Sequence, residues 1–389
     1  MPARRALVTA SVACLAALAV AGCAQNGSSS SAVTVSGKTL SIYVSEPSNL
    51  ASDPVAQDVV DAEKLAFSQH HGDVTAYKLE IVPREESAIS QNARDAIQDP
   101  TAIAYLGEIA PGSSDETVGI TNTLDLLEVS PTDTALELSQ STPAVSGAPQ
   151  TYFESWSSYG RTFARVVPNA ADEAKAQVAE MKALGVTRLH VASDGSDYGK
   201  AIADAVSSDA QAAGLTLEAS VGEEVNGYFY GAQSPSAAAK FFNRIASMAP
   251  TAKLFGSSSL DSAAFTSAIS SSAHNLYVSI PGFVPKDLPA EGKAFVTAFK
   301  AAYHHTPNTE AIFGYAAMSA VLGVLQSAGS GANDRNTVIK DFLAQRNVPS
   351  ALGTYSIDKA GNTNLDAFVF ARMRNGKLVP FAAAPTTQG

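Results

Sequence analysis

The residues best suited to contact a bound molecule lie in one polar loop, Asp194-Gly195-Ser196-Asp197-Tyr198-Gly199. Asp194 and Asp197 suggest a calcium site at first, but the loop lacks the dense alternation of oxygen ligands found in calcium-binding loops. No metal site is therefore predicted. The chain also has no G-x-S-x-G, Walker, G-x-G-x-x-G or H-E-x-x-H motif. These observations indicate binding without catalysis and without a cofactor.

Regular elements on both sides would hold this loop in place. Apolar residues over 170–184 recur at helical spacing, with Asn169 or Asp172 as the N-cap. A β run covers 188–193, and a second helix and another β run follow the loop. This order is a βαβ arrangement, which requires a parallel sheet covered on both faces. Loops at the carboxyl ends of such strands line the ligand crevice, so we expect residues 194–198 beside the ligand.

The same stretch carries a resemblance. Its segments RVVPNAADEAKA, LGVTRLHVASDGSDYGKAIADA and AAGL resemble the second-lobe opening of the periplasmic leucine/isoleucine/valine-binding proteins of ABC importers, where a helix, a strand and a D-x-x-x-Y-G loop follow in this order. The match covers most of residues 39–381. It implies an α/β fold of two doubly wound parallel-sheet lobes joined by a multi-strand hinge, the type I periplasmic binding protein fold. Lobe 1 would comprise 39–165 and 285–350, and lobe 2 would comprise 166–284 and 351–383.

Two further loops extend the resemblance. A G-x-x-x-x-G-S pattern at 107–113 precedes a predicted helix, and an S-P-x-x-T pattern at 130–134 follows the next strand. In the family these loops hold the ligand's carboxylate with hydroxyl and backbone N–H groups. The matching positions are Gly112, Ser113, Thr132 and Thr134. Thr134 could instead cap a helix, although a helix N-terminus also favours an anion.

Three positions of the second lobe complete the predicted site. Tyr198 matches a tyrosine that faces the ligand in the family, or it packs beneath the following helix. Gln233 stands where the family often has an aromatic residue. Ser258 stands where the amino-acid binders have a glutamate that pairs with the ligand's ammonium. A buried ammonium without a carboxylate partner is costly, so either Asp261, Asp133 or Glu46 substitutes, or the ligand has no amino group.

The N-terminus resembles a bacterial lipoprotein signal. Arg4 and Arg5 precede an apolar run over 6–19, which is too short for a comfortable membrane span. Val20-Ala21-Gly22-Cys23 is similar to a lipobox, so residues 1–23 are predicted to be a signal peptide and Cys23 the lipidated residue. An ordinary secretory signal or an uncleaved apolar helix are the alternatives. Residues 24–38 would form a flexible linker.

The composition limits the partners. The 389 residues, 46% hydrophobic, suffice for two domains with cores. The 26 basic and 37 acidic residues give a net charge of −11, and loss of Arg4 and Arg5 with the leader would make it 24 − 37 = −13. An acidic chain without a basic cluster argues against nucleic-acid binding.

Residues 139–162 are an insertion relative to the family. This segment is rich in Ser and Pro and then in aromatic residues, namely Tyr152, Phe153, Trp156 and Tyr159. It is either a surface loop that packs on its own lobe or a flap over the cleft.

The sequence predicts a monomeric, extracytoplasmic solute-binding protein, anchored to the cell membrane through Cys23. Its two lobes would close by a hinge motion on a small polar solute bearing a carboxylate or other acceptor groups, and deliver it to an importer permease. A branched-chain amino acid is one candidate solute. A ligand sensor of the same fold is the alternative, and a secreted α/β enzyme is disfavoured because no nucleophile–base pair is present.

Overall fold

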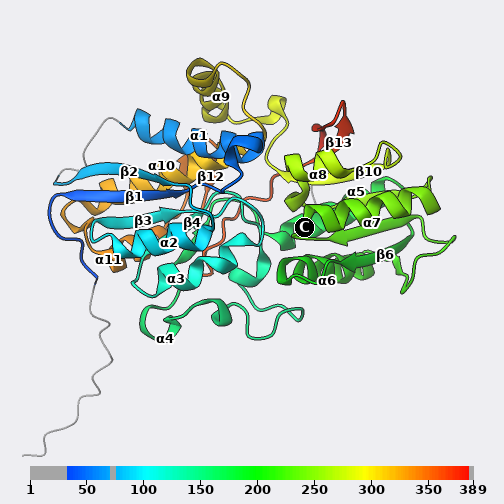
Figure 1. The fold of residues 1–389 in the computed structure, drawn as a ribbon, viewed down its shortest axis with the longest axis horizontal. Helices are drawn as coiled ribbons and strands as arrows, with labels where there is room; N and C mark the ends of the chain where they lie inside the picture. The colour runs from blue at the N-terminus through cyan, green and yellow to red at the C-terminus, as the bar shows by residue number, and fades with distance from the viewer. Residues whose placement is uncertain (1–32, 71–75, 385–389) are drawn as a thin grey trace, which may run out of the picture. The chain divides into compact units, whose positions relative to one another are not determined.

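Two main β-sheets and the helices that cover them make up the fold (Figure 1). The computed structural model describes residues 33–70 and 76–384. The predicted signal peptide, Cys23 and most of the predicted linker lie outside the described residues. The first sheet has the order β2-β1-β3-β4-β5, and all its paired strands are parallel. Its strands are β1 (Thr39–Ser45), β2 (Lys78–Arg84), β3 (Ala102–Leu106), β4 (Leu127–Ser130) and β5 (Phe163–Arg165).

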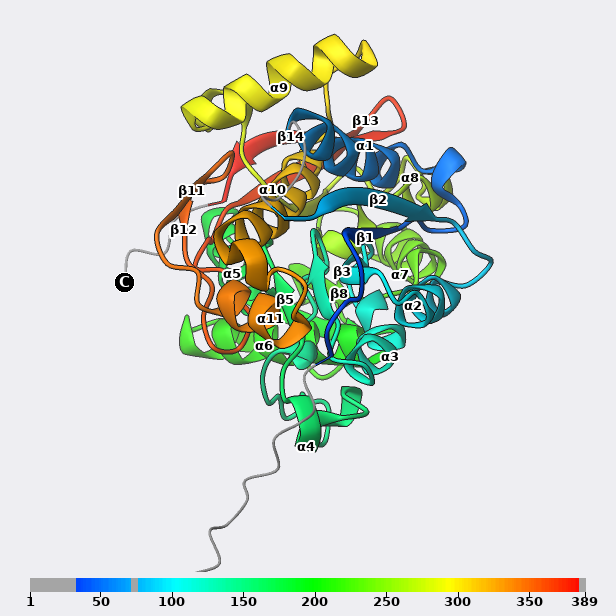
Figure 2. The ribbon, with the colours of Figure 1, turned by 90° about the vertical axis from the view of Figure 1, so that its left-hand side faces the viewer.

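Helices cover both faces of the first sheet, because successive strand residues point to opposite sides. On β1, Ile42 and Val44 join one core cluster and Tyr43 joins another. Figure 2 shows α1 and α10 on one side of β1 and β2, and α2 and α3 on the other. The helices are α1 (Pro54–Gln69), α2 (Ile89–Gln98), α3 (Val118–Asn122), α9 (Ala290–Tyr303), α10 (Ala311–Ala328) and α11 (Arg335–Leu343).

The contact between α1 and α10 depends on a glycine. A Cβ atom at Gly314 would lie 2.2 Å from the carbonyl oxygen of Val59, so only glycine allows the two helices to approach this closely. The stretch Ala311–Gly331 is long and apolar enough to cross a membrane, yet most of it is buried inside the fold. We therefore interpret α10 as a core helix.

The second sheet has the order β14-β13-β10-β9-β8-β6-β7. Strands β6 to β10 pair in parallel, and β13 and β14 form an antiparallel edge. The strands are β6 (Arg188–Ser193), β7 (Thr216–Leu217), β8 (Gly227–Gly231), β9 (Lys253–Gly256), β10 (Leu276–Pro281), β13 (Phe368–Arg374) and β14 (Lys377–Ala383). The predicted α/β class with two mainly parallel sheets is confirmed.

Opposite faces of this sheet also belong to two cores. Phe229 and Phe255 pack with α5 and α6, whereas Tyr228 and Leu254 pack with α7 and α8. The helices are α5 (Ala170–Ala183), α6 (Asp197–Ala212), α7 (Pro235–Met248) and α8 (Ala263–Ala268). The predicted cap is confirmed, because the Asn169 side chain accepts hydrogen bonds from the N–H groups of Ala171 and Asp172.

One region differs from the predicted elements. The helix expected near Ser114 is a 3₁₀ turn, η2 (Ser113–Glu116), followed by the five-residue α3. The tail from residue 353 to residue 381 has the pattern of β strands, and it contains β12 (Gly353–Tyr355), β13 and most of β14. Just before it, β11 (Val348–Ser350) pairs with β12. Asn375-Gly376 is a strong hairpin turn signal, and it does join β13 to β14.

The lobe boundaries stay a prediction. Ala351, Leu352 and Tyr355 pack in the core of the first sheet, although the sequence assigns 351–383 to lobe 2. Packing thus places the return to the second sheet later than residue 351.

Candidate functional site

Loops from the carboxyl ends of both sheets meet at Ser258. Thr134 follows β4 in the first sheet, and its hydroxyl lies 3.2 Å from the hydroxyl of Ser258, which follows β9 in the second sheet. The hydroxyl of Tyr198, in the first turn of α6, lies 3.4 Å from the same Ser258 oxygen. All three residues are buried. The structure thus brings together the hydroxyls of three of the seven predicted site residues, where strand-end loops are expected to bind ligands.

A carboxylate that the sequence analysis missed lies in this cluster. Glu173, in the first turn of α5, accepts hydrogen bonds from the Ser258 N–H (2.6 Å), the Ser258 hydroxyl (3.0 Å) and the Ser279 hydroxyl (2.5 Å). Burial raises the pKa of Glu173 to about 7, although these hydrogen bonds oppose the increase. Glu173 therefore places a buried carboxylate directly beside Ser258.

A signal for Glu173 was present in the sequence. Glu173, Gln177 and Glu180 recur at helical spacing on α5, and all three are buried. Gln177 supports the cluster because its amide nitrogen donates to the Gly256 carbonyl and lies 2.7 Å from the Ser279 hydroxyl. A polar stripe on the buried side of a helix is rare unless its groups have partners.

The three substitutes named from the sequence have different surroundings. The Glu46 carboxylate lies 2.7 Å from the Lys64 ammonium. Asp133 accepts hydrogen bonds from the N–H groups of Gly112 (2.7 Å), Ser114 (2.9 Å) and Ala135 (2.9 Å). Asp261 follows η5 (Ser258–Leu260), and burial followed by the charge of Asp53 raises its pKa to about 7. Of these three, Asp261 alone has a carboxylate without a hydrogen-bond or ion-pair partner within residues 33–70 and 76–384.

The donors predicted for a ligand carboxylate are engaged inside the protein. The Gly112 N–H binds Asp133, as described above. The Thr132 hydroxyl donates to the Ile109 carbonyl (2.6 Å), and the Ser113 hydroxyl donates to the Ala110 carbonyl. In this structure, these contacts shape the loop after β3, and the assignment of Gly112, Ser113 and Thr132 to the ligand stays a prediction.

The loop after β3 packs directly against two residues that belong to loops and helices of the second sheet, Tyr198 and Gln233. Gly112 has a φ of +88°, and a Cβ there would lie 2.8 Å from the Tyr198 Cβ and 3.2 Å from the Gln233 amide nitrogen. Gln233 is itself held through its backbone N–H, which donates to Asp194 (2.9 Å). Both the backbone angle and the close contact therefore favour glycine at position 112.

Asp194 has a structural role in this arrangement. Its carboxylate accepts hydrogen bonds from the N–H groups of Ser196, Gln233 and Ser234. Within the residues that the structure describes, no group of three or more His, Cys, Asp or Glu side chains could hold a metal ion.

The insertion contacts the loop that carries Tyr198. It contains η4 (Gln150–Tyr152) and α4 (Trp156–Tyr159), and it follows η3 (Leu136–Leu138), which packs on α6. The Tyr152 hydroxyl donates to the Asp197 carboxylate (2.8 Å), whereas Trp156 packs on Phe153 with ring centroids 5.0 Å apart. One part of the insertion thus packs on itself, as a surface loop would, and another part reaches the loop at 194–199, as a flap would.

Comparisons with known proteins agree with this geometry. Residues 225–377 match the family described as periplasmic binding protein, and no curated protein is significantly similar to the chain in sequence. A leucine binding protein, LivK, from Thermotoga maritima has a similar structure, with a TM-score of 0.71 at 17% identity, over 90% of this chain and 99% of that one.

Two other solved structures are similar. A substrate-binding protein from Desulfitobacterium hafniense in complex with Leu has a TM-score of 0.69 at 19% identity, over 88% of this chain and 100% of that one. A solute binding protein from R. palustris in complex with benzoate has a TM-score of 0.64 at 16% identity, over 90% of this chain and 96% of that one. The resemblance found in the sequence is confirmed: the chain has the two-lobe fold of the type I periplasmic binding proteins, whose family matches its residues 225–377.

Proposed function

We propose that the protein is an extracytoplasmic solute-binding protein of an ABC importer, which binds a small polar solute between the strand-end loops of its two sheets. The observation that carries the proposal is the buried cluster of Thr134, Tyr198, Ser258 and Glu173. Its members come from both sheets, so a molecule bound there would hold the two sides together. The family match and the solute-binding proteins of similar fold support this function.

The cluster offers two kinds of contact to a solute. The hydroxyls of Thr134 and Tyr198 can donate to an acceptor such as a carboxylate, and the Glu173 carboxylate can accept from an ammonium. An amino acid carries both groups. The similar proteins from T. maritima and D. hafniense are described with leucine, and the protein from R. palustris with benzoate. A small amino acid or organic acid is therefore the solute class that we propose.

The bound solute would be delivered to an importer permease in the membrane. A lipid on Cys23 would keep the protein at the outer side of the cell membrane, and the linker 24–38 would let it reach a permease. Binding would shift the protein toward a closed state by the difference in contacts between open and closed forms. The protein would act as a monomer, without a cofactor and without catalysis.

Titration calorimetry with a panel of amino acids and aromatic acids tests the proposal. We expect at least one to bind, and Thr134→Ala to weaken that binding about tenfold, which corresponds to about 1.4 kcal/mol. Thr297→Ala is the matched control, because its hydroxyl bonds to its own helix at Lys293. Failure of the whole panel to bind, or equal binding by both variants, would contradict the proposed site.

A further inference from the structure

Four acidic side chains are close enough beside the proposed site to influence one another electrostatically. Asp53 is the N-cap of α1, and Glu310 directly precedes α10. Glu173 and Asp261 lie with the elements around the second sheet. Glu173 accepts a hydrogen bond from Ser258, and Asp261 follows Ser258 by one 3₁₀ turn. Burial raises the pKa of Glu310 well above its ordinary value, and the nearby charges of Asp261, Asp53 and Glu173 raise it further. Acids from both sides of the fold thus repel one another at this place.

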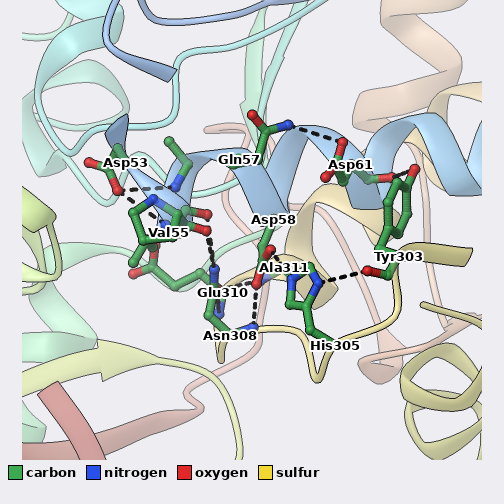
Figure 3. A network of polar contacts seen from close by, with 12 residues as sticks. Asp53, Val55, Gln57, Asp58, Asp61, Tyr303, His305, Asn308, Glu310 and Ala311 are labelled. Atoms are coloured by element: carbon green, nitrogen blue, oxygen red, sulfur yellow. Dashed lines mark hydrogen bonds and ion pairs between the residues drawn. The ribbon is translucent and has the colours of Figure 1, made fainter. Parts of the chain in front are cut away.

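Asn308 fixes the first-sheet half of this acidic group. Its amide nitrogen donates to the carbonyls of Pro54 (3.3 Å) and Val55 (3.0 Å), and its amide oxygen accepts from the Glu310 N–H (2.9 Å). Figure 3 shows Glu310 and Asp53 at the same end of this network, at the start of α1. Glu310 is therefore held beside the helix turn that Asp53 caps.

A tight backbone contact brings the second-sheet side to the same place. A Cβ on Gly282 would lie 2.4 Å from a side-chain atom of Thr309 and 3.0 Å from its carbonyl oxygen. Gly282 directly follows β10, and Ser279 in β10 donates to Glu173. Strand β10 pairs with β9, which leads to Ser258 and Asp261. Backbone packing thus places the residue before Glu310 against the end of β10, next to the strand that leads to Ser258 and Asp261.

No basic side chain within residues 33–70 and 76–384 pairs with Glu310 or Asp261. Glu310 is only 5% exposed, yet among the described residues its carboxylate has no hydrogen-bond or ion-pair partner, and neither does that of Asp261. Two basic side chains nearby are already paired, since Lys64 on α1 lies 2.7 Å from Glu46 and His305 before α10 lies 2.7 Å from Asp58. An ionised carboxylate in so buried a position is costly, so Glu310 either keeps its proton or is joined by a cation.

We propose that the solute carries a basic nitrogen, an ammonium or guanidinium, which binds among Asp53, Asp261 and Glu310 and supplies the positive charge that the protein lacks there. This inference rests on the proposed function and narrows its solute class to basic amino acids and related amines. The acids do not form a metal-binding group within residues 33–70 and 76–384. An organic cation with several N–H donors suits carboxylates spread over two sides of a cleft better than a single ion does.

Lysine and norleucine are the probes, because they have the same carbon chain and differ in the terminal amine. We expect lysine to bind at least about tenfold more tightly than norleucine in titration calorimetry. Glu310→Gln and Asp261→Asn should each reduce this preference. Asp53→Asn should do the same while the helix keeps its cap, since asparagine is also a good N-cap. Arginine and 1,4-diaminobutane extend the panel to a guanidinium and to a diamine without a carboxylate.

Glu128→Gln is the matched control. Glu128 is a buried acid bonded to Thr117 and Thr121, and its replacement should leave the lysine preference unchanged. Melting temperatures of all variants establish that they fold. Norleucine binding as tightly as lysine, or a lysine preference that survives in Glu310→Gln and Asp261→Asn, would overturn the inference. If norleucine binds as tightly as lysine and Thr134→Ala weakens that binding, the proposed function stands and the inference about a basic nitrogen fails. If no compound binds, the proposed function and the inference both fail.

Discussion

The backbone N–H of Ser258 donates a 2.6 Å hydrogen bond to the carboxylate of Glu173, 85 positions earlier in the chain. Ser258 lies in the loop after β9, and the first turn of α5 places the carboxylate of Glu173 beside it. Under the proposed function, this carboxylate is the acidic group that a solute's ammonium would meet, although position 258 is a serine.

Glu173→Gln should change the pH dependence of stability. Since folding raises the pKa of Glu173 from 4.5 to about 7, the folded state holds its proton more tightly than the unfolded state. The contribution of Glu173 is therefore fully present below about pH 4.5 and is lost as the pH rises through about 7. Urea unfolding of both proteins from pH 4.5 to 8 should show the wild type losing up to about 3 kcal/mol relative to the variant. Parallel curves would mean that Glu173 does not titrate in this range.

Gly314→Ala should destabilise the fold. The new methyl group would press on the Val59 carbonyl oxygen, and overpacking of this kind costs about 1–3 kcal/mol or more. Gly323→Ala on the same helix is the control, because nothing lies within 4 Å of the added Cβ. Alanine is the better helix former, so the control should be neutral or gain up to about 1 kcal/mol. Thermal unfolding measures both, and equal effects would rule out the close contact.

Asp133→Ala should lower the free energy of unfolding by about 3 kcal/mol or more. The carboxylate satisfies three backbone N–H groups in buried loops, and unsatisfied buried donors are costly. Asp133→Asn should cost less because its amide oxygen can still accept from Gly112 and Ala135. Urea unfolding separates the two variants, and a neutral Asp133→Ala would show that the loop rearranges around the loss.

Tyr152→Phe tests whether the insertion responds to the solute. The substitution removes the hydrogen bond to Asp197 and should cost about 0.5–1.5 kcal/mol of stability. Trp156, the single tryptophan, should change its fluorescence when solute binds, and this change should be smaller in the variant. Fluorescence that stays constant while calorimetry records binding would favour the surface-loop interpretation.

Cys23→Ser tests the lipid anchor. Because the sulfur that would carry the lipid is gone, the variant should accumulate as unprocessed or soluble protein. Membrane fractionation and the mass of the mature chain measure this outcome. Normal processing with unchanged membrane association would contradict the lipoprotein prediction.

Local sequence determined most of the elements. Asn169 caps α5, as its type and position predicted, because a cap needs only the next few N–H groups of the same segment. Strand β6 matches the β run predicted at 188–193, and the Asn375-Gly376 turn closes the β13–β14 hairpin. These features depend on neighbours within a few residues, so the sequence alone is sufficient to predict them.

Tertiary structure decided the partners within the site. The sequence places Thr134, Tyr198 and Ser258 on separate loops, and only the fold brings their hydroxyls within 3.2 to 3.4 Å. The carboxylate of Asp133 accepts from the N–H of Gly112, in the loop after β3. The carboxylate beside Ser258 belongs to Glu173. Such pairings follow from how two sheets and their helices pack, which depends on the summed burial of many side chains. No local pattern of residue types encodes those long-range contacts.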